Sequence, residues 1–170
     1  MALPRGRSLH SMSKDQKSGP PTIKNRKARH EFQIEETYEA GLALKGTEVK
    51  SLRDGKASLN EAFAYIKNGE IWLKNMYIKP YEHGSYNNHD ERRDRKLLLK
   101  RREIREIDKA LSQKGKTLVP LKLYFKNGYA KLLVGLATGK KKYDKREDIK
   151  EKDVRREIDR KVKGSYKVNL

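Results

Sequence analysis

The chain has 170 residues, a mass of 19.8 kDa and a formal net charge of +19 at pH 7. This length fits one domain with flanking tails, and no apolar run approaches the roughly 20 residues that a membrane-spanning helix needs. The absence of cysteine excludes a disulfide framework and thiolate chemistry and fits a reducing cytosol. So large a cationic excess indicates a polyanionic partner, and nucleic acid is favoured over an anionic membrane surface.

The N-terminal segment, residues 1–22, is rich in Ser, Gly, Pro and basic residues and has no apolar signal region. We expect a disordered leader here, with Met12 as an alternative start and an organelle transit peptide as a competing interpretation. Closely spaced cations follow, from residue 23 to the first strand. They indicate an arm that grips phosphate, the alternative being a solvated arm without a partner. The arm comprises Lys24, Asn25, Arg26, Lys27, Arg29 and His30.

The stretch from Glu31 to Gly55 combines two periods. Apolar residues occupy almost every even position from Phe32 to Leu44, which predicts a long strand with one buried face. A short helix should follow, with Thr47 as its cap and a stop at Gly55.

Two Asn-Gly pairs predict β-hairpins. Asn68-Gly69 lies between the runs 63–67 and 70–74, and Asn127-Gly128 separates LVPLKLYFK from YAKLLVGLA. Asn-Gly between apolar runs is a strong hairpin signal, because both turn residues adopt positive φ. With the opening strand, these hairpins give about five or six strands. Pro120 indicates a sheet edge or a bulge.

The segment between the hairpins divides into a loop and a helix. Residues 83–95, HGSYNNHDERRDR, predict a long polar loop, in which the spacing of His83, His89 and Asp90 matches no standard metal site. Residues 96–115, KLLLKRREIREIDKALSQKG, predict a helix ended by Gly115.

These elements favour a mainly β fold. We expect residues 23–138 to form an OB-fold-like closed antiparallel β-barrel with inserted helices, because short strands escape exposed edges by closing on themselves. Residues 139–170 form a basic tail with few large apolar residues, which we expect to be disordered when free. Val154, Ile158 and Val162 fall four apart, so the tail could become helical on an RNA surface, or form a charged helix that packs weakly on the barrel.

Four motifs carry a family resemblance: NRKARHEF, EAGLALKGTEVKSLR, KLLL and GKKKYDKR. In order and spacing they closely resemble the small protein B (SmpB) family, the SsrA-binding proteins of bacterial trans-translation. The resemblance implies an OB-type barrel that binds the tRNA-like domain of transfer-messenger RNA (tmRNA) and enters stalled ribosomes with elongation factor Tu. It further implies alanyl-tRNA synthetase as an indirect partner, a cytoplasmic monomer, and neither a cofactor nor a membrane contact.

The resemblance also implies site residues. Asn25, Glu39, Leu98 and Lys131 match positions that contact the tRNA-like domain, and the cations of the arm belong with them. A lysine suits phosphate, and a carboxylate can accept from a base amino group or a 2′-hydroxyl. Two alternatives stay open: Glu39 as a cross-strand partner of a cation and Leu98 as a core residue. Whether Lys50 and Arg53 touch RNA is also open.

In the tail, the resemblance implies a segment that enters the ribosomal decoding centre. Tyr143 stands where the family carries an aromatic or His, and an aromatic face can stack on an exposed base. Residues 148–163 would then form a helix in the empty mRNA channel. The implied decoding-centre residues are Lys140, Lys141, Tyr143, Asp144, Lys145 and Arg146.

Two other functions are conceivable. The protein could bind structured RNA generally, without preference for tmRNA. A nuclease would need clustered carboxylates for metal or a positioned histidine base, and Asp90, Glu91 and Asp94 alternate with arginines in a way that suits ion pairing better. We therefore expect no catalytic residues and no metal site.

Overall fold

A computed structural model describes residues 19–166, except for the side chains of residues 142, 143, 165 and 166. Only the last four residues of the expected leader fall within this range. The strands are β1 (Ile23–Lys24), β2 (Phe32–Leu42), β3 (Ala57–Ser58), β4 (Phe63–Lys67), β5 (Glu70–Lys74), β6 (Tyr77–Ile78), β7 (Arg95–Leu98), β8 (Lys116–Lys126) and β9 (Tyr129–Gly139). The helices are α1 (Ala28–Glu31), α2 (Gly46–Arg53), α3 (Arg101–Leu111) and α4 (Lys142–Tyr166).

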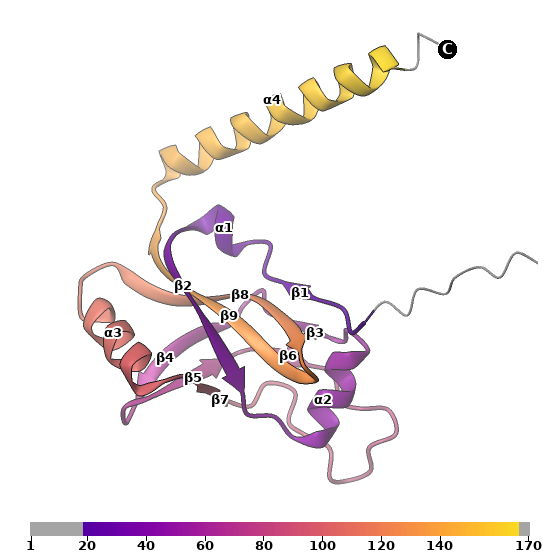
Figure 1. Cartoon of the computed structure of the whole chain (residues 1–170), viewed down its shortest axis with the longest axis vertical. Coiled ribbons are helices and arrows are strands. Elements are labelled where there is room, and N and C mark those ends of the chain that lie inside the picture. The colour runs from indigo at the N-terminus through magenta and orange to yellow at the C-terminus, as the bar shows by residue number, and fades with distance from the viewer. Residues whose placement is uncertain (1–18, 167–170) are drawn as a thin grey trace, which may run out of the picture.

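Six strands pair in a ring. Their order is β8-β4-β5-β7-β2-β9, and β8 pairs again with β9, so that each of the six has a neighbour on both sides (Figure 1). All pairings are antiparallel. β1 adds to β8, and β3 and β6 form a separate pair. The prediction of a mainly β fold with about five or six principal strands is confirmed, and closure leaves few unpaired backbone groups at sheet edges.

Both predicted hairpins are present. β4 and β5 flank Asn68-Gly69, and β8 and β9 flank Asn127-Gly128. The turn residues have positive φ: 53° and 71° in the first turn, 52° and 79° in the second. These values suit a two-residue turn whose twist matches that of the strands.

The long strand β2 contains a bulge that the alternation did not predict. Its pairing with β9 shifts between Ile34 and Glu36. Tyr38, after the bulge, packs on the main core, whereas Phe32 and Ile34, before it, pack on a second cluster around Ala28. The even positions therefore do not share one buried face, because the extra residue changes the face that follows.

Pro120 also lies at a bulge, as its position predicted. The register between β8 and β9 shifts from Pro120 to Lys122. Proline lacks an N–H for the ladder, so an irregularity of this kind accommodates it.

Two helices contribute to the core from different sides of the ring. In Figure 1, α3 lies to the left of the strands and α2 to the right. Ile107 of α3 and Leu52 of α2 are both fully buried in the main cluster. The helix predicted over residues 96–115 is too long, because residues 95–98 form β7 and the helix spans only 101–111. Pairing of β7 with β5 and β2 overrides the helical spacing of its leucines.

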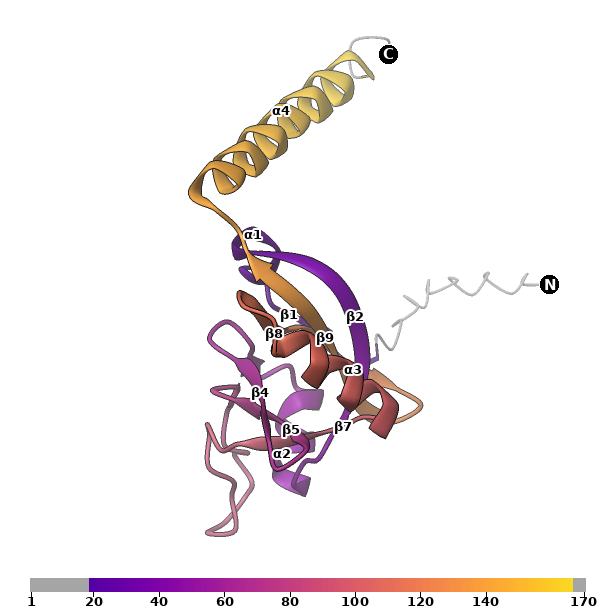
Figure 2. The ribbon, with the colours of Figure 1, turned by 90° about the vertical axis from the view of Figure 1, so that its left-hand side faces the viewer.

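The described part of the tail differs from the disorder expected for it. Residues 142–166 form the helix α4, which is about 37 Å long and points away from the ring (Figure 2). Ion pairs within the helix support it locally, among them Lys161 with Glu157 at 3.3 Å. The apolar residues of the predicted stripe, Val154, Ile158 and Val162, are 49–56% exposed, so the stripe is not buried against the ring.

A buried carboxylate, Glu48, joins α2 to the start of β7. The Nε and Nη2 atoms of Arg93 and the Nε of Arg95 each donate to Glu48 at 2.8 Å. Glu48 and Arg95 are both inaccessible to solvent, and the Nη1 of Arg95 donates to the carbonyl of Met76 at 2.7 Å. Glu48 also accepts from the backbone N–H of Lys45, so Lys45 precedes the helix as its cap and the prediction of Thr47 in that role is wrong.

We predict that Glu48→Gln lowers the free energy of unfolding by about 3–5 kcal/mol, because it leaves the buried Arg95 charge without its counter-ion. Burial raises the pKa of Glu48, but donation from Arg93, Lys45 and Arg95 outweighs it and the net pKa is lowered. The stabilisation is therefore fully present at pH values above the ordinary pKa of a glutamate. It is lost as the pH falls through the lowered pKa of Glu48.

Denaturant unfolding at several pH values tests this prediction. The control is Glu61→Gln. The Glu61 side chain is 72% exposed and its ion pair with Arg92 is long, at 3.8 Å, so its loss should cost little stability. Equal stabilities of the two variants at neutral pH would contradict the assigned role of Glu48.

Candidate nucleic-acid interface

Three of the residues assigned from the resemblance meet at one hollow, which we call the β2 hollow. Glu39 comes from β2, Leu98 from β7 and Lys131 from β9. The ring brings them together because Gly41 is the register partner of both Leu98 and Lys131. A Cβ atom at Gly41 would lie 3.2 Å from Leu98 Cβ, so glycine permits the close approach. The hollow is lined by Glu39, Gly41, Leu98, Leu99, Lys100, Glu103 and Lys131.

Glu39 is held as an exposed carboxylate. The Tyr124 hydroxyl donates to it, and Lys126 Nζ lies 3.4 Å away. This hydrogen bond from Tyr124 and the nearby lysines lower the pKa of Glu39. Burial, together with the hydrogen bond to Glu39, raises the pKa of Tyr124 to about 12. Glu39 therefore has a cross-strand cation, Lys126, as the alternative to an RNA contact expected. Its carboxylate still has lone pairs that can accept hydrogen bonds from the solvent side.

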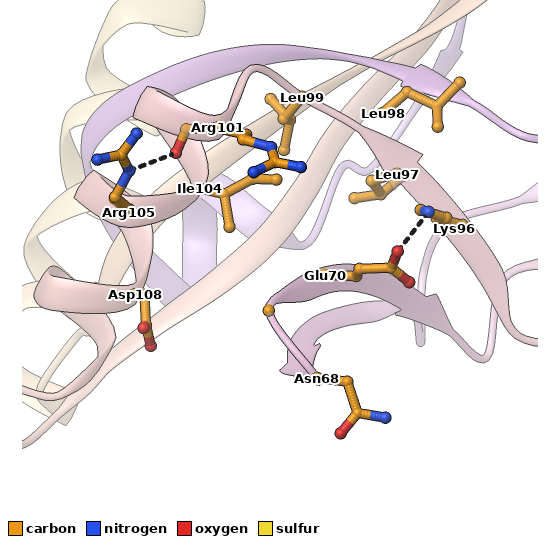
Figure 3. Close-up of a pocket in the computed structure, with 11 residues that line it drawn as sticks. Asn68, Glu70, Lys96, Leu97, Leu98, Leu99, Arg101, Ile104, Arg105 and Asp108 are labelled. Carbon is orange, nitrogen blue, oxygen red and sulfur yellow. Dashed lines mark hydrogen bonds and ion pairs between the residues drawn. The ribbon is translucent and has the colours of Figure 1, made fainter.

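Leu98 is not a core residue, so that alternative is wrong. It is 52% exposed, whereas its neighbour Leu97 is buried. Figure 3 shows Leu97 and Leu98 leaving β7 in different directions, and both residues border the space between β5 and α3. That space is a second hollow, lined in part by Ile104, Arg101 and Arg105 of α3. An exposed leucine beside Lys131 offers an apolar surface next to a cation.

The arm lies at the other end of β2. Lys24, Arg26 and Arg29 are exposed and His30 is half-buried, while Ala28 is buried and anchors α1 on the second cluster. The cations are thus held on short ordered elements. Of the two basic residues left open on α2, Lys50 lies over the ring of Tyr81 and Arg53 over that of Phe125, at 5.2 and 5.9 Å.

Asn25 differs from its neighbours because it is only 8% exposed. Its Nδ2 donates to the carbonyl of Pro120 at 2.9 Å, and its backbone N–H donates to Leu121 at 2.8 Å. It therefore ties the arm to the β8 bulge, where the ladder leaves a carbonyl to be satisfied. Its Oδ1 has no partner among the described residues. Sequence reasoning assigned it as an RNA contact and missed this packing role, since nothing local marks a bond to a residue 95 positions away.

The base of the tail sits beside the arm. The Lys140 backbone N–H donates to the carbonyl of Glu31 at 2.9 Å, its Nζ donates to the carbonyl of Arg29 at 2.9 Å, and the same ammonium pairs with Asp148. Lys141, Asp144 and Arg146 are exposed and Lys145 is half-buried. The side chain of Tyr143 lies outside the described residues.

The site residues therefore fall into two groups at opposite ends of one strand pair. Gly41 pairs with Lys131 at the β2 hollow, and Phe32 pairs with Gly139 at the arm and tail. Nine steps along β2 separate these pairs, or up to about 30 Å. One compact ligand cannot cover both groups, but a folded polyanion or two different partners can.

Catalytic or metal chemistry has no support in the described part of the chain. No three potential metal-ligating side chains cluster there. His89 is 5% exposed and hydrogen-bonds to Thr47 and the Ile78 carbonyl, which is a packing role. No helix within residues 19–166 has the length and apolar character to cross a bilayer.

Sequence reasoning missed several residues around Glu39. Tyr124 and Lys126 hold its carboxylate from β8, and Gly41 permits the contact of β2 with Leu98. The alternation of β8 before the Asn127-Gly128 turn places Tyr124 and Lys126 on one face and could have found them. Gly41 carries no comparable local signal, because its need arises only when the ring closes.

Exposed cations on a β ring, without a catalytic cluster in the described residues, define the chain as a nucleic-acid-binding protein. The chain belongs to the SmpB family: the family model described as SmpB protein matches residues 22–164.

Relatives and a solved structure agree with this assignment. The SsrA-binding protein of Bacillus pumilus is 54% identical over 88% of this chain and 96% of its own length. The SsrA-binding protein of Bacillus subtilis is 53% identical over 88% of this chain and 96% of its own length. The SsrA-binding protein of Thermobifida fusca is 57% identical over 86% of this chain and 92% of its own length. A solved chain described under "tmRNA-SmpB: a journey to the center of the bacterial ribosome" is 58% identical, covers 80% of this chain and 96% of its own, and has a TM-score of 0.61.

We predict that Asn25→Ala lowers the free energy of unfolding by about 1–2 kcal/mol, because the buried Pro120 carbonyl loses its donor. Arg26→Ala, at an exposed neighbour, should leave stability within about 0.5 kcal/mol and weaken RNA binding instead. Chemical denaturation and RNA titration of both variants measure the two effects. If Asn25→Ala weakens RNA binding without loss of stability, Asn25 acts as a direct contact and not through packing.

Proposed function

We propose that this protein binds the tRNA-like domain of tmRNA, also called SsrA, and delivers it to stalled ribosomes for trans-translation. The outcome is rescue of the ribosome and tagging of the nascent peptide for degradation. Membership of the SmpB family, with more than 50% identity to SsrA-binding proteins over most of the chain, carries this proposal. The similar tmRNA-SmpB structure, described with the bacterial ribosome, supports both partners.

In this proposal the β2 hollow and the arm grip the tRNA-like domain. Lys131 supplies a charge for phosphate, Leu98 an apolar surface for a base or sugar, and Glu39 an acceptor for an amino group or 2′-hydroxyl. The exposure of Glu39 and Leu98, the half-exposed position of Lys131 and the meeting of all three at one hollow support these roles. Lys24, Arg26 and Arg29 add charge at the arm, His30 adds a polar ring, and Asn25 acts there by positioning the arm.

The tail has the other partner, the 16S rRNA of the decoding centre and the empty mRNA channel. Its residues Lys140, Lys141, Tyr143, Asp144, Lys145 and Arg146 enter the decoding centre, and α4 follows into the channel. The projection of α4 away from the ring and the exposure of its described side chains support this role. A channel that holds mRNA has no room for the helix, which gives selection for ribosomes without a usable message.

The remaining parts of the proposal concern the fold type and the setting. We take the six-strand ring as a closed OB-type barrel with inserted helices, because its strands are short, antiparallel and paired on both sides. The protein acts as a cytoplasmic monomer without a cofactor. Elongation factor Tu and alanyl-tRNA synthetase join it through tmRNA.

Competition between tmRNA and ordinary tRNA, measured across a salt series, tests the RNA preference. We predict that the tRNA-like domain keeps its advantage at high salt, since purely electrostatic binding weakens steeply with salt for any RNA. Lys131→Ala should weaken tmRNA binding and reduce the salt slope by about one. Lys109→Ala, an exposed lysine of α3 outside both hollows, is the matched control. Indistinguishable RNAs at every salt concentration would mean that the protein binds structured RNA generally.

A chain truncated after Lys141 tests the division of labour. It keeps the Lys140 contacts to Glu31 and Arg29 but lacks α4. We predict tmRNA affinity within about twofold of the full chain, because the β2 hollow is intact, and loss of peptide tagging in a reconstituted translation system. Loss of tmRNA binding itself would show that the tail takes part in tmRNA binding and does not serve a separate partner.

A further inference from the structure

An aromatic surface lies on the outside of the ring, on β4 and β5. Ala64, Ile66, Ile71 and Leu73 of this hairpin face the main core. Side chains alternate along a strand, so Phe63, Tyr65 and Trp72 face outwards. None of the three belongs to either core cluster, and Phe63 is 41% exposed. We call Phe63, Tyr65 and Trp72 the aromatic platform.

The three rings are neighbours. Tyr65 is the direct register partner of Trp72, and the centroids of Phe63 and Tyr65 are 6.3 Å apart. Directly opposite residues on one face of an antiparallel pair have Cβ atoms about 5 Å apart. The three rings thus lie together on one face that spans two strands, with Phe63 exposed and Tyr65 and Trp72 half-buried. It includes the only tryptophan in a chain of which just 8% is aromatic.

Lysines surround the platform. Lys74 lies opposite Phe63, and Lys96 lies opposite Trp72 on the far side. The nearest carboxylates are engaged: Lys96 binds Glu70 at 2.6 Å, as Figure 3 shows, and Asp94 accepts from the Tyr65 hydroxyl at 2.8 Å. Lys67 and Lys74 form no ion pair among the described residues and are exposed. Aromatic faces bordered by free ammonium groups complement stacked bases and their phosphates.

We propose that the aromatic platform is a second RNA-binding surface, which takes two or three unpaired nucleotides of a single strand by stacking their bases on Phe63, Tyr65 and Trp72. Unpaired bases are required, because a duplex buries the π faces that stacking uses. Lys67 and Lys74 bind the phosphates. Specificity for sequence is low, since every base has a π face.

This surface is separate from the site of the proposed function. In the ring order β8-β4-β5-β7-β2-β9, the platform strands β4 and β5 lie across from β2 and β9, which carry Glu39 and Lys131. Leu98, the third residue at the hollow, lies on β7 between the two surfaces, and it belongs to the hollow and not to the platform. An RNA held by Glu39 and Lys131 therefore leaves Phe63, Tyr65 and Trp72 for another single-stranded segment of the same or a second RNA. The inference goes beyond the binding of the tRNA-like domain and does not depend on it.

Trp72 provides the test, because its fluorescence reports on this face alone. The full chain is titrated with ten-nucleotide oligouridylate and oligoadenylate, and binding is followed in parallel by anisotropy of a labelled oligonucleotide. We expect quenching of Trp72 that saturates with the anisotropy signal. Phe63→Ala keeps the reporter and should weaken the quenching isotherm about tenfold, the loss of one stacking contact. Phe63→Leu, which keeps the apolar volume, should weaken it too and serves if the alanine variant does not fold.

Two control variants make the result specific. Tyr129→Ala removes an exposed aromatic at the β8–β9 turn, off the platform, and should leave the isotherm unchanged. Lys131→Ala should lower tmRNA affinity without changing quenching by the oligonucleotides, which separates failure of the platform from failure of the proposed function. Binding by anisotropy with no change in Trp72 fluorescence would overturn the proposal, because the strand would then lie elsewhere. A concentration-dependent Trp72 shift without RNA would overturn it in favour of a second copy of the chain.

Discussion

The buried Glu48 carboxylate is the interaction on which most of the architecture depends. It binds Arg95 at the start of β7, Arg93 just before it, and the backbone N–H that begins α2. Through Arg95 it also reaches the carbonyl of Met76, after β5. β7 pairs with β5 and β2, so these contacts fix the strand that closes one side of the ring. Leu98, which borders the β2 hollow, lies on that strand. The position of a proposed RNA contact therefore rests on a charge pair that no solvent reaches.

The sequence could predict the local features of this fold but not its long-range charge pairs. The two Asn-Gly turns were found because the signal, positive φ at both residues, is contained in two letters. The acids beside Arg93 and Arg95 look in the sequence like their ion-pair partners, whereas their shared partner, Glu48, lies 45 and 47 positions away. The leucines of β7 fit a helix as well as a strand in the sequence, because a short apolar run looks alike in both until its pairing is known.

The candidate site was predictable to a similar degree. The resemblance supplied Glu39, Leu98 and Lys131, and the ring explains why three distant positions meet: Gly41 pairs with strands on both sides. It did not supply the environment of Asn25, whose amide satisfies a carbonyl that a bulge in another strand exposes. Nor did it indicate the platform around Trp72. Alternation marks which residues share a face, but only the ring shows that this face is uncovered.

The β2–β9 strand pair fixes the distance between the two groups of proposed binding residues. One end carries Lys131 and Glu39, and the other carries the arm and the first residues of the tail, which Lys140 fastens to Arg29. The spacing between these ends is set by the number of residue pairs in the ladder, at about 3.3 Å for each. Removing two residues from each strand would preserve every face of the sheet and shorten the spacing by about 7 Å. The length of β2 and β9 therefore sets the distance between the two binding groups. A larger complex must match this distance as closely as it matches any side chain.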